Sequence, residues 1–114
     1  MIKVSKFGGS SVADAGQFKK VRDIVRSDPD RMYIVASASG KRFADDNKIT
    51  DLLLLVNAHI AYHVDCSSLL RDIEDRFVEI ADELGVKYPV SEKFEEFSSV
   101  IKSLSPEYIV SRGE

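Results

Sequence analysis

The sequence contains one cysteine and no tryptophan, and its charged residues show no basic excess. A single cysteine, Cys66, cannot form an internal disulfide, and together with His59 and His63 it supplies too few ligands for a tetrahedral zinc site. The net charge of −3 leaves no basic field that would hold a nucleic-acid backbone. We therefore expect a reduced, cytoplasmic protein that binds no nucleic acid.

Long apolar runs are also missing. The run Leu52–Val56 is far shorter than the roughly 20 residues that a membrane-spanning helix needs. The N-terminus has neither the apolar core nor the cleavage pattern of a signal peptide. By contrast, 44% hydrophobic and 31% charged residues in 114 positions are typical of one small globular domain with its own core. No membrane association is expected.

The first 37 residues follow a strand–helix–strand pattern. Residues 1–7 alternate between apolar and polar side chains, and residues 12–25 carry apolar side chains at three- and four-residue steps. Pro29 ends that helical pattern, and the apolar run Met32–Ala36 predicts a fully buried second strand. This order is typical of the unit that builds parallel sheets.

Helices are expected over most of the remaining chain. One is predicted to begin at Leu52, capped by Thr50 or Asp51, and to run to about His63. The later helical stretches are predicted over residues 67–84, ended by Gly85, over residues 94–104, and from a new N-terminus at Ser105–Glu107. Because two strands are too few for the sheet that such a unit joins, we interpret residues 1–114 as the N-terminal part of a larger domain.

The turn K-F-G-G-S-S follows the first strand directly. Glycines between a strand and a helix let backbone N–H groups face an anion, and Lys6 stands at the carboxyl end of the strand, where open α/β sheets bind ligands. The alternative is a plain tight turn with a surface lysine. The spacing fits neither a Walker loop nor a dinucleotide-binding fingerprint.

Three later motifs carry further candidate residues. S-A-S-G-K, residues 37–41, repeats the small-residue turn after the second strand, and parallel strands bring both turns to one sheet edge. Taken alone, it reads as a polar loop, and T-D-L-L from Thr50 reads as a capped buried helix. In S-R-G-E, Gly113 falls within a predicted helix, which indicates either a close backbone approach or a frayed end.

In this order, the four motifs closely resemble the N-terminal part of the catalytic domain of aspartokinases, within the amino acid kinase family. The resemblance covers the chain from end to end. It implies an α/β fold, a three-layer αβα sandwich of which this chain holds the N-terminal part. It also implies ATP-dependent phosphorylation of the side-chain carboxylate of L-aspartate to 4-phospho-L-aspartate, the first step of lysine, threonine and methionine biosynthesis.

The resemblance assigns roles to individual residues. Lys6 matches the lysine that contacts the transferring phosphate, and the ATP phosphates are assigned to Lys6, Phe7, Gly8, Gly9 and Ser10. The substrate aspartate is assigned to Ser39, Thr50 and Glu114. Mg²⁺ is expected to be held mainly by ATP, with no metal ligand in this chain, and members of the family are usually dimers or larger.

Two departures from the family pattern stand out. Residues 41–49 make a longer connection than many members have, and the adenine-binding half of the domain and the regulatory domains have no counterpart here. The 114 residues are therefore expected to lack kinase activity alone. The rival hypotheses are another amino acid kinase, of the glutamate 5-kinase or acetylglutamate kinase type, and a non-catalytic binding or assembly module.

Overall fold

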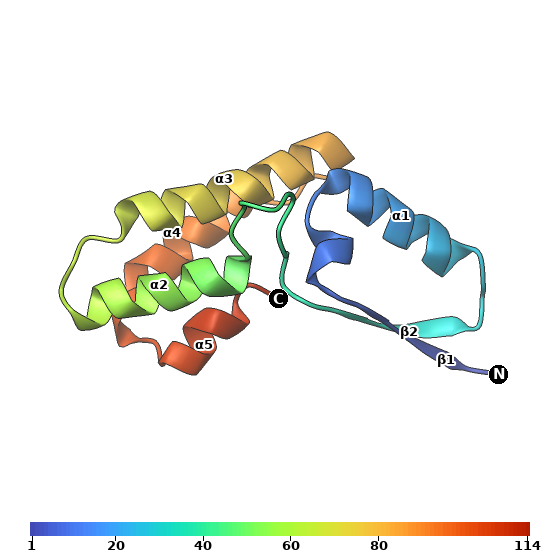
Figure 1. The fold of residues 1–114 in the computed structure, drawn as a ribbon, viewed down its shortest axis with the longest axis horizontal. Helices are drawn as coiled ribbons and strands as arrows, with labels where there is room; N and C mark the ends of the chain where they lie inside the picture. The colour runs from blue at the N-terminus through green and yellow to red at the C-terminus, as the bar shows by residue number, and fades with distance from the viewer.

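The computed structural model describes all 114 residues and begins with a strand–helix–strand unit (Figure 1). Strands β1 (Lys3–Phe7) and β2 (Arg31–Ala36) are parallel neighbours. A 3-10 turn, η1 (Gly9–Val12), and helix α1 (Ala15–Arg26) connect them. The sequence prediction of this unit is confirmed.

The remaining chain is helical. Figure 1 shows α2, α4 and α5 gathered along one end of α3, while α1 lies beside the other end of α3. The strand pair projects from the molecule on the side of α1. These elements are α2 (Ile49–Ala61), α3 (Ser67–Leu84), α4 (Val90–Val100), η2 (Ile101–Ser103) and α5 (Pro106–Ser111).

The helix ends test the capping predictions. Gly85 ends α3 in the left-handed conformation, with φ of 68°, and the Ser105 hydroxyl accepts a hydrogen bond from the Tyr108 amide at the start of α5. Both predictions are confirmed. The helix predicted near Leu52 is present as α2, but its predicted start and cap are wrong, because it begins three residues earlier, at Ile49, and Thr50 and Asp51 lie inside it.

The core lies between α2, α3 and α5. Its most buried large side chains are those of Ile49, Val56, Ile73 and Ile109. In the leucine run of α2, Leu53 is buried whereas Leu54 is 52% exposed, because a helix turns only one face toward its neighbours. None of the helices combines the length and apolarity needed to cross a membrane.

The strands lie outside this core. Met32, Tyr33, Ile34 and Val35 are 64%, 59%, 42% and 50% exposed, so the prediction of a fully buried second strand is wrong for this chain. A parallel strand becomes buried only when further strands and a helical layer on each face surround it. The two strands here have no further strand beside them.

Two adjacent leucines of α2 test the position of the core. Replacement of Leu53 by alanine should lower the free energy of unfolding by about 2–4 kcal/mol, because it removes a buried side chain and leaves a cavity. The same replacement at the half-exposed Leu54 should cost less than about 1 kcal/mol. Urea denaturation of both variants measures the difference, and equal losses would contradict the assignment of the buried face.

Candidate functional site

The two small-residue loops touch through their backbones. The Gly40 amide donates a hydrogen bond of 2.8 Å to the Gly9 carbonyl. A Cβ on Gly40 would lie 2.8 Å from the Gly9 carbonyl carbon, and one on Gly9 would lie 3.0 Å from the Ala38 oxygen. Both positions therefore favour glycine, and Gly40 does so most strongly. The prediction that the loops following β1 and β2 meet at one edge of the strand pair is confirmed.

Gly8 has a different environment from Gly9. A Cβ at Gly8 would meet no atom within 4 Å, and its φ of −74° is open to any residue. The amides of Gly9 and Ser10 donate to no protein acceptor, whereas the Ser11 amide donates to the Gly8 carbonyl. Two backbone N–H groups of this loop thus lack a protein acceptor, and the neighbouring position, Gly8, has open space around it. Lys6, at the end of β1, is exposed and takes part in no ion pair.

The S-R-G-E motif packs against α2. Gly113 follows the end of α5 and is buried, and a Cβ there would lie 3.1 Å from Ile49 Cγ2, 3.1 Å from Leu53 Cδ1 and 3.3 Å from Ala38 Cβ. Of the two interpretations of this glycine, the close approach is the one observed. Its neighbours are a helix and a loop of the same chain.

This packing gathers three residues assigned by the resemblance. Ser39, Thr50 and Glu114 each directly follow one of the three residues in contact, Ala38, Ile49 and Gly113. Ser39 is buried, Thr50 is half-buried and Glu114 is exposed. Three motifs separated by up to 75 positions in the chain therefore meet beside the contact between Gly9 and Gly40.

The long connection between Ser39 and Thr50 closes on itself. The Ile49 amide donates to the Ser39 carbonyl at 3.0 Å, which fixes the start of α2 next to Ser39 despite the intervening loop. Within the loop, the Arg42 guanidinium binds both carboxylate oxygens of Asp46, at 2.7 and 3.0 Å. The hydrogen bonds from Arg42 hold the pKa of Asp46 well below its usual range.

One residue at this junction was missed by the sequence analysis. Arg76 on α3 is only 5% exposed, and its guanidinium donates to the carbonyls of Asn47 (2.7 Å), Gly40 (2.7 Å) and Ala13 (3.1 Å). The sequence does indicate that Arg76 is buried, because it falls on the apolar face of its predicted helix, three residues after Ile73 and four before Ile80. A charged residue there must find partners in the interior.

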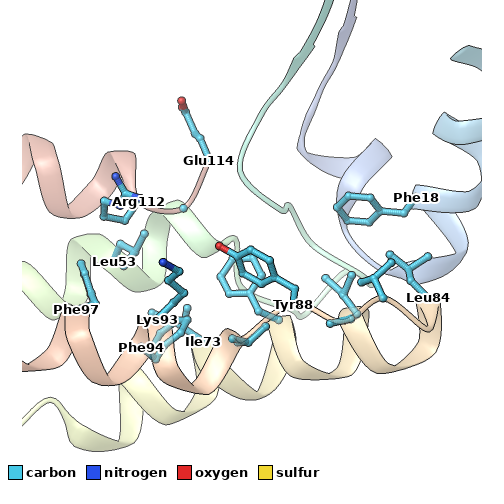
Figure 2. A pocket seen from close by; sticks show the side chains of 16 residues that line it. Phe18, Leu53, Ile73, Leu84, Tyr88, Lys93, Phe94, Phe97, Arg112 and Glu114 are labelled. Atoms are coloured by element: carbon cyan, nitrogen blue, oxygen red, sulfur yellow. The ribbon is translucent and has the colours of Figure 1, made fainter.

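An apolar groove of about 520 Å³ opens between α1, α3, α4 and the C-terminal residues. Figure 2 shows Phe18 on one side and Phe94 and Phe97 on the other, with the carboxylate of Glu114 at the rim and directed away from the aromatic rings. The groove therefore lies next to the junction, and of the assigned site residues only Glu114 reaches its rim.

Two curated aspartokinases are similar in sequence to this chain. No family model matches the chain. It is 41% identical over 92 residues to aspartokinase 3 of Bacillus subtilis, covering 81% of this chain and 20% of that protein. It is 34% identical over 122 residues to the chloroplastic aspartokinase 2 of Arabidopsis thaliana, covering 97% of this chain and 22% of that protein.

Solved structures agree with these sequences. The aspartate kinase of Clostridium acetobutylicum superposes with a TM-score of 0.91 at 44% identity, over 96% of this chain and 26% of that one. The chain is therefore similar in sequence and in fold to a part of these aspartate kinases. Aspartokinase III of E. coli, solved with aspartate and ADP, superposes over the whole chain and 26% of its own, with a TM-score of 0.75 at 29% identity. The chain thus spans about a fifth to a quarter of these aspartate kinases, and the predicted α/β fold is confirmed.

A pair of glycine variants tests the contact between the loops. Gly40→Ala should destabilise the protein by about 1–3 kcal/mol, because the new Cβ would overlap backbone atoms of Gly9, which cannot move aside as a flexible side chain could. Gly8→Ala is the matched control and should leave the free energy of unfolding within about 0.5 kcal/mol of its original value. Thermal denaturation compares the two, and a harmless Gly40→Ala would contradict the close approach.

The pair Arg42–Asp46 predicts a dependence of stability on pH. Because the pKa of Asp46 is lowered in the folded protein, its contribution is complete above about pH 4 and is lost as the pH falls further. Asp46→Asn should therefore be less stable than the parent at pH 7, and this difference should shrink below pH 4. Asp45→Asn, which removes a neighbouring carboxylate outside any ion pair, is the control in urea titrations across this pH range. A constant difference between Asp46→Asn and the parent would contradict the assignment.

Proposed function

We propose that this chain forms the part of an aspartate kinase that holds the substrate aspartate and the phosphates of ATP. The reaction transfers the γ-phosphoryl group of ATP to the side-chain carboxylate of L-aspartate and yields 4-phospho-L-aspartate and ADP. The observation that carries this proposal is the meeting of the Ser39, Thr50 and Glu114 segments beside the two touching glycine loops. The similar E. coli enzyme, solved with aspartate and ADP, adds support.

The chemistry asks little of the protein beyond positioning and charge neutralisation. The aspartate side chain is already ionised at neutral pH, so no general base is needed. One of its oxygens bonds to the γ-phosphorus, and the bond from that phosphorus to the β,γ-bridging oxygen breaks, which leaves the electron pair on ADP. Negative charge gathers on the phosphoryl oxygens, and nearby cations and N–H donors lower the barrier.

Lys6 is proposed as the catalytic residue that neutralises this charge. It stands at the end of β1 with a free, exposed ammonium group. Gly9 and Ser10 would donate their unpartnered amides to phosphate oxygens, and the open space at Gly8 would admit the nucleotide close to the backbone, next to Phe7. A phosphate loop needs these two properties, free donors and room to approach.

The aspartate is proposed to bind at the junction of the three other segments. The exposed carboxylate of Glu114 would accept hydrogen bonds from the α-ammonium group of the substrate. The hydroxyls of Ser39 and Thr50 would donate to its carboxylates. Aspartate bound in this way would lie beside the glycine loop, and its side-chain oxygen would face the γ-phosphate.

The proposal also covers the source of Mg²⁺, the cellular location and the oligomeric state. No three carboxylate, imidazole or thiol side chains of the chain lie close enough together to hold a cation, so no metal ligand is proposed here, and Mg²⁺ would arrive on the ATP phosphates. A cytoplasmic location is proposed for an ATP-dependent enzyme whose one cysteine is a free thiol. Assembly into homo-oligomers is proposed on the family resemblance alone.

A chimeric enzyme tests the function directly. These 114 residues replace the matching segment of B. subtilis aspartokinase 3, and trapping of the acyl phosphate with hydroxylamine measures activity toward aspartate, glutamate and acetylglutamate. We expect ATP-dependent phosphorylation of aspartate. In this chimera Lys6→Ala should lower kcat by about 10²–10³-fold, because the transferring phosphoryl group loses its cation.

Lys3→Ala is the matched control, since Lys3 lies on the same strand and only pairs with Asp28 at the surface. It should leave kcat unchanged. A folded chimera that phosphorylates glutamate or acetylglutamate instead would indicate one of the other amino acid kinases. A folded chimera without activity, or Lys6→Ala with full activity, would indicate a glycine turn of purely structural purpose.

A further inference from the structure

Arg76 connects the parts of the proposed site that the chain brings from far apart. Its three acceptors are the carbonyls of Ala13, which follows the phosphate loop, of Gly40, which follows Ser39, and of Asn47, three residues before Thr50. One planar guanidinium therefore binds each of the three segments that lead into or out of the proposed ligands. No other side chain in the structure donates to all three.

The placement of Gly40 makes this connection direct. Gly40 donates its amide to the Gly9 carbonyl, and its own carbonyl accepts from Arg76 at 2.7 Å. The residue that touches the phosphate loop is therefore held from both sides. A shift of the Gly40 backbone would move Gly9 and Ser39 together, because each is bonded or adjacent to it.

The chemistry of the interaction is unusual for a purely structural contact. A buried cation is expensive unless it is paired, yet the one carboxylate within 4.0 Å of the Arg76 guanidinium, that of Asp46, is already bound by Arg42. Nε of Arg76 is buried without an acceptor. An apolar side chain would fill this space at lower cost, but only the rigid fork of an arginine presents donors to three separate carbonyls.

We propose that Arg76 is a positioning residue of the phosphoryl-transfer site, which holds the phosphate loop and the aspartate-binding loop in their reactive arrangement. This inference rests on the proposed function. Transfer between two bound substrates depends steeply on their alignment, and a displacement of about 1 Å can lower the rate by about 10²-fold. Arg76 touches neither substrate and acts through the backbones of Gly40, Ala13 and Asn47.

Two variants in the chimeric enzyme test the role. Arg76→Met keeps the length of the side chain and removes every donor, whereas Arg76→Lys keeps the charge but gathers its donors on one nitrogen. Per folded molecule, we expect kcat to fall by about 10²-fold in Arg76→Met and by less in Arg76→Lys, with smaller changes in KM for aspartate and ATP. Arg71→Met, on an exposed position of the same helix, should leave both constants unchanged.

Hydrogen exchange on the 114-residue chain separates loop positioning from general stability. In Arg76→Lys, exchange of the Gly40 amide should accelerate at least tenfold more than exchange of the core amide of Ile73, because the loops separate without global unfolding. If Arg76→Met does not fold, Arg76→Lys decides the outcome by the same two measurements.

Equal acceleration at Gly40 and Ile73, or full kcat per folded molecule in the variants, would overturn the role of Arg76. An inactive parent chimera would instead contradict the proposed function, and the exchange ratio would still decide whether Arg76 holds the loops.

Discussion

The placement of the two loops against the helices depends on the hydrogen bonds of one buried group, the guanidinium of Arg76. The hydrophobic core lies among the helices, whereas the strand pair stands outside it with both strands largely exposed. The loops that follow the strands are joined to the helical part by the hydrogen bonds of Arg76 to Ala13, Gly40 and Asn47, and by the packing of α1 on α3. These hydrogen bonds and the packing of α1 on α3 together orient the strands relative to the core.

The glycines of the proposed site differ in the space around them. At Gly9, Gly40 and Gly113 other atoms of the protein crowd the space that a side chain would need, most severely at Gly40. Gly8 lacks a side chain where the protein leaves the space open. The motif K-F-G-G-S-S therefore contains one glycine that packing favours, Gly9, and one, Gly8, that would leave room for the proposed nucleotide.

Local patterns were enough to predict the first part of the fold, both ends of α3 and the start of α5, whereas the bounds predicted for α2 and α4 were wrong. Residues 1–36, Gly85 and Ser105 follow short-range rules of alternation, helix periodicity and capping, and the structure confirms them. Tertiary contacts decided the features that were missed. The start of α2 is set by the hydrogen bond from the Ile49 amide to the Ser39 carbonyl, and β2 is exposed because no strand other than β1 lies beside it. The partners of Arg76 are 29 to 63 positions away, beyond the reach of any local pattern.

The proposed binding site rests on the contacts that bring four distant motifs together at one junction. Its most direct test is a crystal structure of the chimeric aspartate kinase with aspartate and ADP bound. Ser39, Thr50 and Glu114 should contact the aspartate, and Lys6 with the amides of Gly9 and Ser10 should face the phosphate end of the nucleotide. Aspartate bound away from these residues, with the loops unchanged, would contradict the proposed site.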